Sequence, residues 1–167
     1  GEIWGRAQTD WLLAGLKRST APVKLIANGT QVVTRSTSGE GHRREAQNEL
    51  HRLIAHIEKH RIDGVIFLSG DRHYSELHFE ARDGHPPLLE FTSSPLQQDQ
   101  KVEPLQNRPN TFRLWGLKGN SFGLVTVDIP EEGQGVVRLE VRTEINTVPV
   151  IENTRCSSAW QLSDLQY

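Results

Sequence analysis

Residues 64–77 read GVIFLSGDRHYSEL, and this stretch decides the class of fold. Residues 65–68 are four large apolar residues in a row, which is typical of a short strand buried on both faces of a sheet. A serine and a glycine end the run, and two potential metal ligands, Asp71 and His73, follow. In open α/β sheets, ligands bind beyond the carboxyl ends of the strands. We therefore expect Asp71 and His73 to reach a cleft from a rigid base.

The segments before this strand alternate between helical and extended patterns. Apolar residues recur at a spacing of 3.6 over residues 43–60, which predicts the most clearly patterned helix of the chain. A helix, a turn and a buried strand in this order predict an α/β arrangement. The full set is a helix over 6–18, a strand over 23–26, an Asn28-Gly29 turn, a short Gln31-Val32-Val33 segment, a polar loop over 34–42 and the helix over 43–60.

The segments after His73 change to the alternation of half-buried strands. Glu76, His78 and Glu80 alternate with apolar residues, so we expect them on a solvent-facing side. The dipeptide at 83–84, Asp-Gly, is a strong hairpin signal. We predict strands over 76–81, 88–91, 122–129 and 136–142, a long polar loop over 97–113 and a polar tail from about residue 146. The whole, residues 1–167, is predicted to be a single partial domain.

Composition excludes several classes of protein. The chain has 167 residues, 35% of them apolar and 24% charged, with a net charge of −2, so there is no strong attraction to nucleic acid or to an anionic membrane. No apolar run approaches the roughly 20 residues that a membrane span needs. The single cysteine, Cys156, excludes an intrachain disulfide. The chain contains no methionine, so we expect it to be processed or to be a piece of a longer protein.

The local chemistry of Asp71 and His73 leaves two interpretations open, a metal site and an ordinary turn at the end of a strand. Two ligands are fewer than the roughly four that zinc takes. A carboxylate with an imidazole suits several divalent and trivalent ions. Ser93 and Ser94, at the end of a predicted strand, also allow two interpretations. They could face a cleft, or they could simply terminate the strand, which is the interpretation that we favour.

Residues 43–61, rich in arginine and histidine, offer a second candidate surface. His56 and His60 are four residues apart and could touch one ion, and the same helix could present a basic face to nucleic acid. Glutamates dilute its charge, and no aromatic residues are interleaved for stacking on bases. We favour a solvated helix face. The sequence also lacks a Gly-x-Ser-x-Gly elbow and a Walker-type phosphate loop.

The run VIFLSGDRHYSEL resembles the terminal metal-binding segment of the alkaline phosphatase D (PhoD-like) family, a branch of the metallophosphoesterases. Further segments resemble the family in the same order along the chain, and the match spans about residues 5–142. The last of them carries Ser121 between the asparagine and the phenylalanine of the family's Asn-Phe-Gly strand. These segments are GRAQTDWLLAGLKRSTAPVKLIANGTQVV, NELHRLIAHI, PLLEFTSSPL and NSFGLVTVDI.

The resemblance implies a fold, an activity and a site. The fold is the C-terminal half of a layered α/β/β/α sandwich. The activity is hydrolysis of phosphomonoesters and phosphodiesters through a binuclear metal centre, with iron and calcium as a known pairing and other divalent ions as alternatives. Asp71 and His73 would be metal ligands and catalytic, because the PhoD-like branch has Asp in place of the first histidine of Gly-His-x-His. Arg72 and Asn120 would contact the phosphate-ester substrate.

The resemblance also implies that something is missing. The family's earlier ligand motifs lie upstream of its Trp-Leu helix, and nothing in this chain corresponds to them. We therefore expect the upstream half of the same enzyme as a partner, no activity from this chain alone, and no membrane span. Family members are often exported, which implies a periplasmic or extracellular location. The alternatives are a non-catalytic binding module with this half of the fold, or a nucleic-acid-binding domain using the helix at 43–61.

Overall fold

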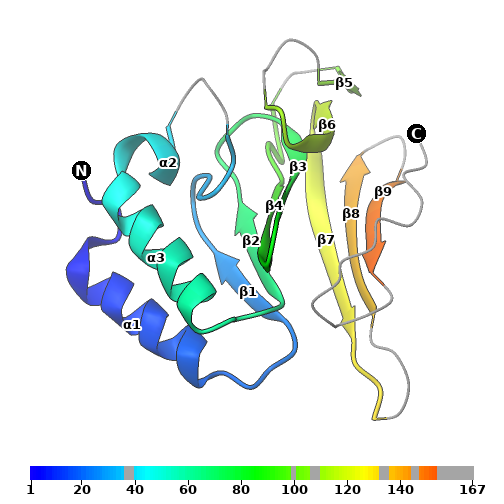
Figure 1. The fold of residues 1–167 in the computed structure, drawn as a ribbon. Helices are drawn as coiled ribbons and strands as arrows, with labels where there is room; N and C mark the ends of the chain where they lie inside the picture. Colours follow the sequence, from blue (N-terminus) through cyan, green and yellow to red (C-terminus); the bar gives the residue numbers. More distant parts are fainter. Residues whose placement is uncertain (36–39, 99–100, 106–109, 132–135, 144–146, 154–167) are drawn as a thin grey trace.

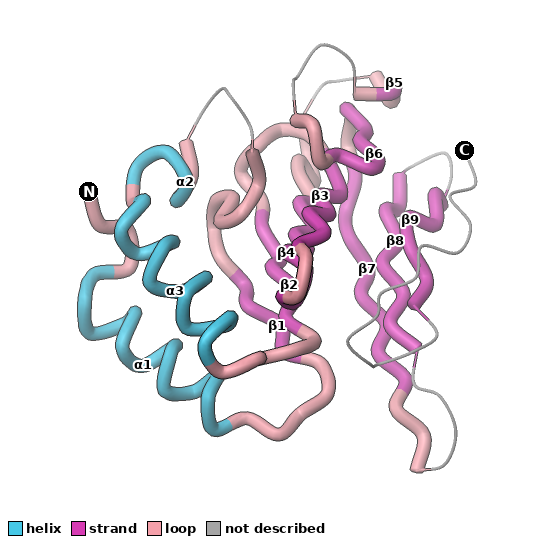
Figure 2. Tube along the Cα trace, in the orientation of Figure 1, coloured by secondary structure: helices cyan, strands magenta, loops and turns pink. Residues whose placement is uncertain are grey.

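The computed structural model describes residues 1–167 except 36–39, 99–100, 106–109, 132–135, 144–146 and 154–167. The described residues form three layers. Figure 1 shows the helices on one side of a six-stranded sheet and a three-stranded sheet on the other side. Figure 2 shows the same order of layers, with the helices gathered in a single layer. This is the mixed α/β architecture that the sequence predicts.

The helical layer consists of α1 (Gly5–Arg18), α2 (His42–Glu45) and α3 (Gln47–Lys59). The helix predicted over 6–18 is confirmed, but the helix predicted over 43–60 is divided in two. Ala46 has φ −133° and ψ 50°, which lie outside the helical region and separate α2 from α3. Apolar side chains of α1 and α3 pack on the sheet, and Glu49 of α3 accepts hydrogen bonds from the N–H groups of Ile3, Trp4 and Gly5 at the start of α1.

The six-stranded sheet has the order β1-β2-β4-β3-β6-β5. The strands β1, β2 and β4 run parallel to one another, whereas β3, β6 and β5 pair antiparallel. The hairpin predicted at Asp83-Gly84 joins β3 to β4, so it is confirmed. The strands are β1 (Lys24–Ala27), β2 (Val65–Ser69), β3 (Ser75–Arg82), β4 (His85–Thr92), β5 (Glu103–Pro104) and β6 (Arg113–Lys118).

The second sheet is an antiparallel meander of β7 (Ser121–Asp128), β8 (Val136–Thr143) and β9 (Thr147–Asn153). The hairpin predicted between β7 and β8 is confirmed. The strand β9 lies within the segment that we predicted as a polar tail. A core of buried apolar residues fills the space between the two sheets, with Leu77, Phe91 and Leu139 at its centre. Cys156 lies outside the described residues.

Two expectations about the six-stranded sheet are wrong. Glu76, His78 and Glu80 do not face solvent; all three are buried. The cause is tertiary, because residues 31–35 and the arginines of neighbouring elements cover that side of β3 and pair with its carboxylates. The segment over 97–113, predicted as loop, contains β5, and β6 follows it where no strand was expected. No helix among the described residues is long and apolar enough to cross a membrane.

Candidate active site

The carboxyl ends of β1, β2 and β4 meet at one edge of the sheet, and their loops come together there. The N–H of Asn28, just after β1, donates to the carbonyl of Leu68, and the N–H of Ser93, just after β4, donates to the carbonyl of Ser69. Gly70 lies between these two loops: a Cβ on it would be 3.7 Å from the carbonyl oxygens of both Gly29 and Ser93. The turn that carries Asp71 and His73 is therefore the middle of three loops.

Asp71 and His73 both have a left-handed backbone, with φ of 64° and 56°. Residues with a Cβ pay about 1–2 kcal/mol for this conformation, which aspartate and histidine tolerate better than most. Both residues are exposed. Strain of this kind persists only where the surroundings impose it, and it concentrates at functional sites. The prediction that the two side chains emerge at the end of a buried strand is confirmed.

Hydrogen bonds that involve three serines from different segments support the turn that carries Asp71 and His73. The N–H of His73 donates to the hydroxyl oxygen of Ser94 at 3.3 Å, and the N–H of Ser94 donates to Ser75 at 3.3 Å. The hydroxyls of Ser75 and Ser121 lie 3.0 Å apart. Ser93 and Ser94 directly follow the end of β4, as the favoured interpretation expects, and Ser94 also supports the turn that carries His73. Ser75 and Ser121 carry no signal in the sequence, because only the pairing of distant strands brings them together.

Asn120 and Arg72, the two predicted substrate contacts, have other partners in this structure. The side-chain oxygen of Asn120 accepts a hydrogen bond from the N–H of Gln98 at 2.5 Å, and the amide of Gln98 lies 3.2 Å from the imidazole of His73. Asn120 therefore adjoins the site through Gln98. Arg72 is only 9% exposed; its Nε donates to the hydroxyl of Tyr74, and its guanidinium lies 5.5 Å from the centre of the Tyr74 ring. The side chain of Arg72, the middle residue of the turn, therefore packs on Tyr74.

A buried polar layer lies under the site, where β2 and β4 end and β3 begins. The hydroxyls of Ser69 and Thr92 are 2.9 Å apart, and the amide of Gln31 donates to Thr92 and to the carboxylate of Glu76. Arg113 of β6 donates to the other oxygen of Glu76 at 2.6 Å. Sequence reasoning missed this layer. The one feature of the sequence that indicated it was the alternating polar residues of β3, which we expected to face solvent.

Glu90, in the middle of β4, holds the segment that follows β1. Its carboxylate accepts hydrogen bonds of 2.7–2.8 Å from the N–H groups of Val32, Val33 and Thr34, and a fourth from the hydroxyl of Thr34. Complete burial raises the pKa of Glu90, although these donors favour its charged form. The short segment expected over 31–33 is buried, and its backbone is bound by a carboxylate instead of a neighbouring strand.

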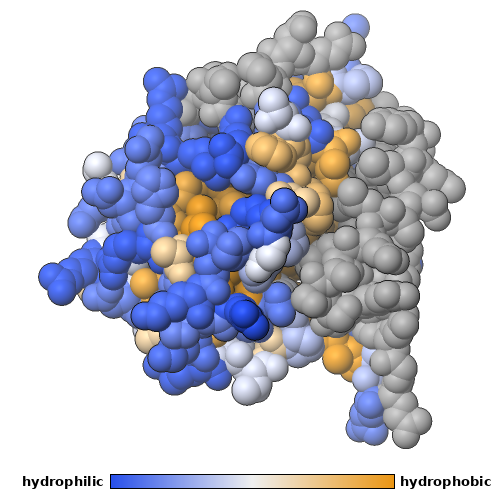
Figure 3. All heavy atoms as spheres, in the orientation of Figure 1, coloured by the Kyte–Doolittle hydropathy of each residue, from blue (hydrophilic) through white to orange (hydrophobic). Residues whose placement is uncertain are grey.

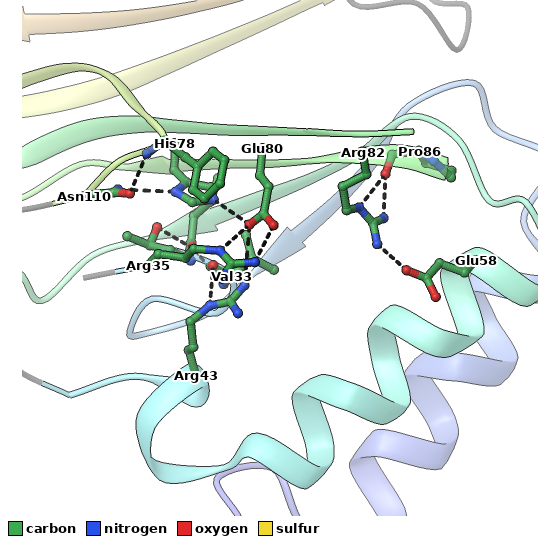
Figure 4. A network of polar contacts seen from close by, with 12 residues as sticks. Val33, Arg35, Arg43, Glu58, His78, Glu80, Arg82, Pro86 and Asn110 are labelled. Carbon is green, nitrogen blue, oxygen red and sulfur yellow. Dashed lines mark hydrogen bonds and ion pairs between the residues drawn. The ribbon is translucent and has the colours of Figure 1, made fainter. Parts of the chain in front are cut away.

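A second polar network lies further along β3, away from the site (Figure 4). Arg35 binds Glu80 through two nitrogens, at 2.9 and 2.5 Å, and the imidazole of His78 lies 3.7 Å from the same carboxylate. Burial alone would raise the pKa of Glu80, but the hydrogen bonds from Arg35 and the nearby positive charges of Arg35 and Arg43 together hold that pKa below its ordinary value. Burial lowers the pKa of His78 to about 4, so this imidazole is neutral at pH 7.

The metal-binding capacity of the described residues is limited. Nowhere in that part of the chain do three or more His, Cys, Asp or Glu side chains gather in a way that could hold an ion. The rings of His56 and His60 lie 4.5 Å apart without a third ligand. Asp71 and His73 likewise supply two donors. Their carboxylate and imidazole fit a divalent or trivalent cation by donor type, and both are accessible.

Two arginines of the segment 43–61 have partners within the chain. Arg43 donates from Nε to the carbonyl of Val33, and Arg52 forms an ion pair with Asp10 at 2.5 Å. His42 is completely buried beside Trp4, with ring centres 4.0 Å apart. Figure 3 shows that the surface over the helices is mainly hydrophilic, as a solvated face should be.

Comparison with known proteins agrees with this geometry. A solved structure described as the structure of PhoD has a similar fold, with a TM-score of 0.57 and 15% identity; the match covers 90% of this chain and 36% of that chain. This chain thus spans about a third of the length of that protein. None of the curated proteins matches. The family model of PhoD-like phosphatases matches residues 1–141, and on this evidence the chain belongs to the PhoD-like phosphatase family.

Proposed function

We propose that this chain is the C-terminal part of a metal-dependent phosphatase or phosphodiesterase, in which Asp71 and His73 donate ligands to a binuclear metal centre. The observation that carries the proposal is their placement. Both are exposed and held in the left-handed conformation at the edge where three parallel strands end. Iron with calcium is the pairing that the resemblance implies. The substrate would be a phosphate ester, and the location would be periplasmic or extracellular.

Cations bound at such a site stabilise charge on phosphoryl oxygens and lower the pKa of water. The contribution of this chain is to hold the two donors. The hydrogen bond from the N–H of His73 to the hydroxyl of Ser94 restrains the backbone of the turn, and the side-chain amide of Gln98 restrains the imidazole ring of His73. Asn120 positions Gln98 and is our candidate for a contact with the ester beside it. Arg72, packed on Tyr74, would support the turn and would reach phosphate only by leaving that ring.

The proposed centre needs more ligands than the two that this chain contributes. Structural and catalytic metal sites take about three or four protein ligands for one ion, and two ions need more. The upstream half of the enzyme would supply the remainder, including the carboxylate that bridges two ions. This agrees with the match to about a third of a longer PhoD chain.

Substitution of the two ligands in the complete enzyme tests this proposal. Asp71→Asn and His73→Ala should each lower hydrolysis of an aryl phosphate ester by about a hundredfold or more, with loss of bound metal measured by elemental analysis. The chain contains a matched control: Asp83 and His85 have the same spacing, are exposed and lie in the β3–β4 hairpin. Asp83→Asn and His85→Ala should leave both readouts unchanged. Normal turnover and metal content in both site variants would refute the proposal.

A further inference from the structure

An apolar hollow of about 400 Å³ lies against β6, beside the end of β5. Leu105 and Leu114 are half-buried in its lining, and Trp115 and Leu117, which also line it, belong to the core between the two sheets. Gly116 allows Leu105 to lie close to β6, because a Cβ on the glycine would be 2.9 Å from that side chain. Figure 3 shows hydrophobic surface where Figure 1 places β5 and β6. The volume is within the range of ligand pockets, about 300–1,000 Å³.

Two parts of the chain connect this hollow to the candidate active site. The strand β6 pairs with β3 so that Leu117 is the partner of Ser75, which follows His73 by two residues. Paired Cα atoms lie about 5 Å apart and two residues span at most about 7 Å, so the Cα of Leu117 lies within about 12 Å of the Cα of His73. Gln98 contacts the imidazole of His73, and the same segment leads on to Leu105 in the lining. The hollow therefore adjoins the turn that carries the proposed metal ligands.

The charge of the lining indicates what kind of group the hollow accepts. Among the described residues that line it, Arg113 alone is charged. Its Nε donates to the carboxylate of Glu76 at 2.6 Å, and the two side chains are 13% and 0% exposed. This ion pair has no net charge, so the hollow has nothing to attract a phosphate group. Burial of apolar surface is the main favourable interaction that it offers.

We propose that this hollow, lined by Leu105, Leu114 and Leu117, binds the alcohol group of the phosphate ester, and that this group is uncharged and apolar. The inference rests on the proposed function, in which Asp71 and His73 hold metal beside the phosphate. An ester bound there can extend an alkyl or aryl group along β6 into the hollow. A polyhydroxylated alcohol would lose its hydrogen bonds to water at this surface without replacing them.

Three 4-nitrophenyl phosphodiesters test the proposal with the complete enzyme. One has a methyl group as its second ester, one has a hexyl group, and the third has the hexyl length with ether oxygens in place of two methylenes. In each reaction water adds to phosphorus, one proton passes to solvent and 4-nitrophenolate leaves. The second alcohol stays on the phosphate, so the leaving group is the same throughout.

The expected result follows from the burial of methylenes. Each buried methylene contributes about fourfold, so kcat/KM should be at least about tenfold higher for the hexyl ester than for the methyl ester. The ether ester should have a kcat/KM close to that of the methyl ester, because its length is the same as hexyl but its polarity is not. Equal kcat/KM values for all three esters would overturn the proposal.

A pair of variants locates the preference. Leu114→Asn should lower the hexyl-to-methyl ratio of kcat/KM from about tenfold or more to about threefold or less, because it removes apolar surface from the hollow. The matched control is Leu124→Asn, a half-exposed leucine of β7 in the second sheet, which should keep the full ratio. The ratio is insensitive to a general loss of folded enzyme. A full ratio in Leu114→Asn would overturn the assignment to this hollow.

Binding without turnover separates this inference from the proposed function. Titration of the complete enzyme with hexyl phosphate should shift the NMR signals of the Leu105 and Leu114 methyl groups, and methyl phosphate should not. Leu25, in another apolar groove between α1 and β1, is the reference that should stay unchanged. Shifts without hydrolysis of any ester would refute the proposed function and keep the hollow as a binding site. Shifts of Leu25 alone, or a concentration-dependent dimer abolished by Leu114→Asn, would overturn the inference.

Discussion

Replacing Asp71 and His73 by glycine should stabilise the fold and abolish the activity together. Each residue has a φ near +60°, which costs a side chain with a Cβ about 1–2 kcal/mol. Glycine removes that cost but adds about 0.5–1 kcal/mol of chain entropy to the unfolded state. The net gain is about 0.5–1 kcal/mol for each position and about 1–2 kcal/mol for the double variant.

The assay is urea unfolding of the complete enzyme in the presence of a chelator, because bound metal would otherwise add its own stabilisation. Arg61 supplies the control, since it also has a left-handed backbone, with φ of 48°, and lies just after α3. Arg61→Gly should gain a similar free energy of unfolding and keep full activity. Asp71→Ala keeps the Cβ and should gain nothing.

The comparison separates a residue held for function from one that merely forms a turn. If Asp71→Gly and His73→Gly lowered the midpoint of unfolding, their side chains would be contributing to the fold. The argument that the backbone is strained to present two ligands would then be wrong, whatever happened to activity. A gain in stability with activity retained would contradict their role as ligands instead.

Three further outcomes are expected. Glu90→Leu leaves three buried N–H groups without an acceptor, and each such group costs about 1–3 kcal/mol. The free energy of unfolding, measured by urea unfolding, should therefore fall by about 3 kcal/mol or more. A loss below about 1 kcal/mol would contradict this account of the carboxylate. Burial lowers the pKa of His78 to about 4 from 6.5, so its contribution to stability is present above pH 6.5 and falls by up to about 3 kcal/mol as the pH drops to 4. His78→Gln should flatten that part of the profile of urea midpoint against pH, and an unchanged profile would show that His78 is not the group responsible. The isolated 167-residue chain should hydrolyse no aryl phosphate at any metal concentration, and metal-dependent turnover by the purified, monodisperse chain would mean that it holds ligands beyond Asp71 and His73.

The elements predicted well from sequence are those with strong local signals. The periodic stripe of α3, the apolar run of β2 and the Asp-Gly hairpin between β3 and β4 each depend on neighbours within a few residues. The strand β6 was missed, although Trp115 and Leu117 are buried in the core between the sheets. The strand β9 was missed because the whole tail was taken as polar, although Val148, Val150 and Ile151 are apolar. Its pairing with β8 identifies it as a strand.

The assignment of Glu76, His78 and Glu80 to solvent failed for a related reason. Alternation of polar and apolar residues shows that a strand has two different faces, but it does not show what covers the polar one. Here an arginine from β6 and another from the segment after β1 neutralise Glu76 and Glu80. Those partners are 37 and 45 residues away in the sequence, so no local pattern could indicate them.

The sequence by itself determined that a buried strand ends in Asp71 and His73, because a continuous apolar run and the glycine after it are local features. It also carried enough family resemblance to indicate a PhoD-like chain. Only the tertiary structure decided what surrounds those two residues. The strand β4 lies between β2 and β3 in the sheet although it follows β3 in the chain, and that insertion brings Ser94 under His73. Non-local strand pairing produces the strained backbone of the turn, the serine hydrogen bonds that support it and the position of β1 at the edge of the sheet. The energy of that pairing depends on residues that meet only after folding.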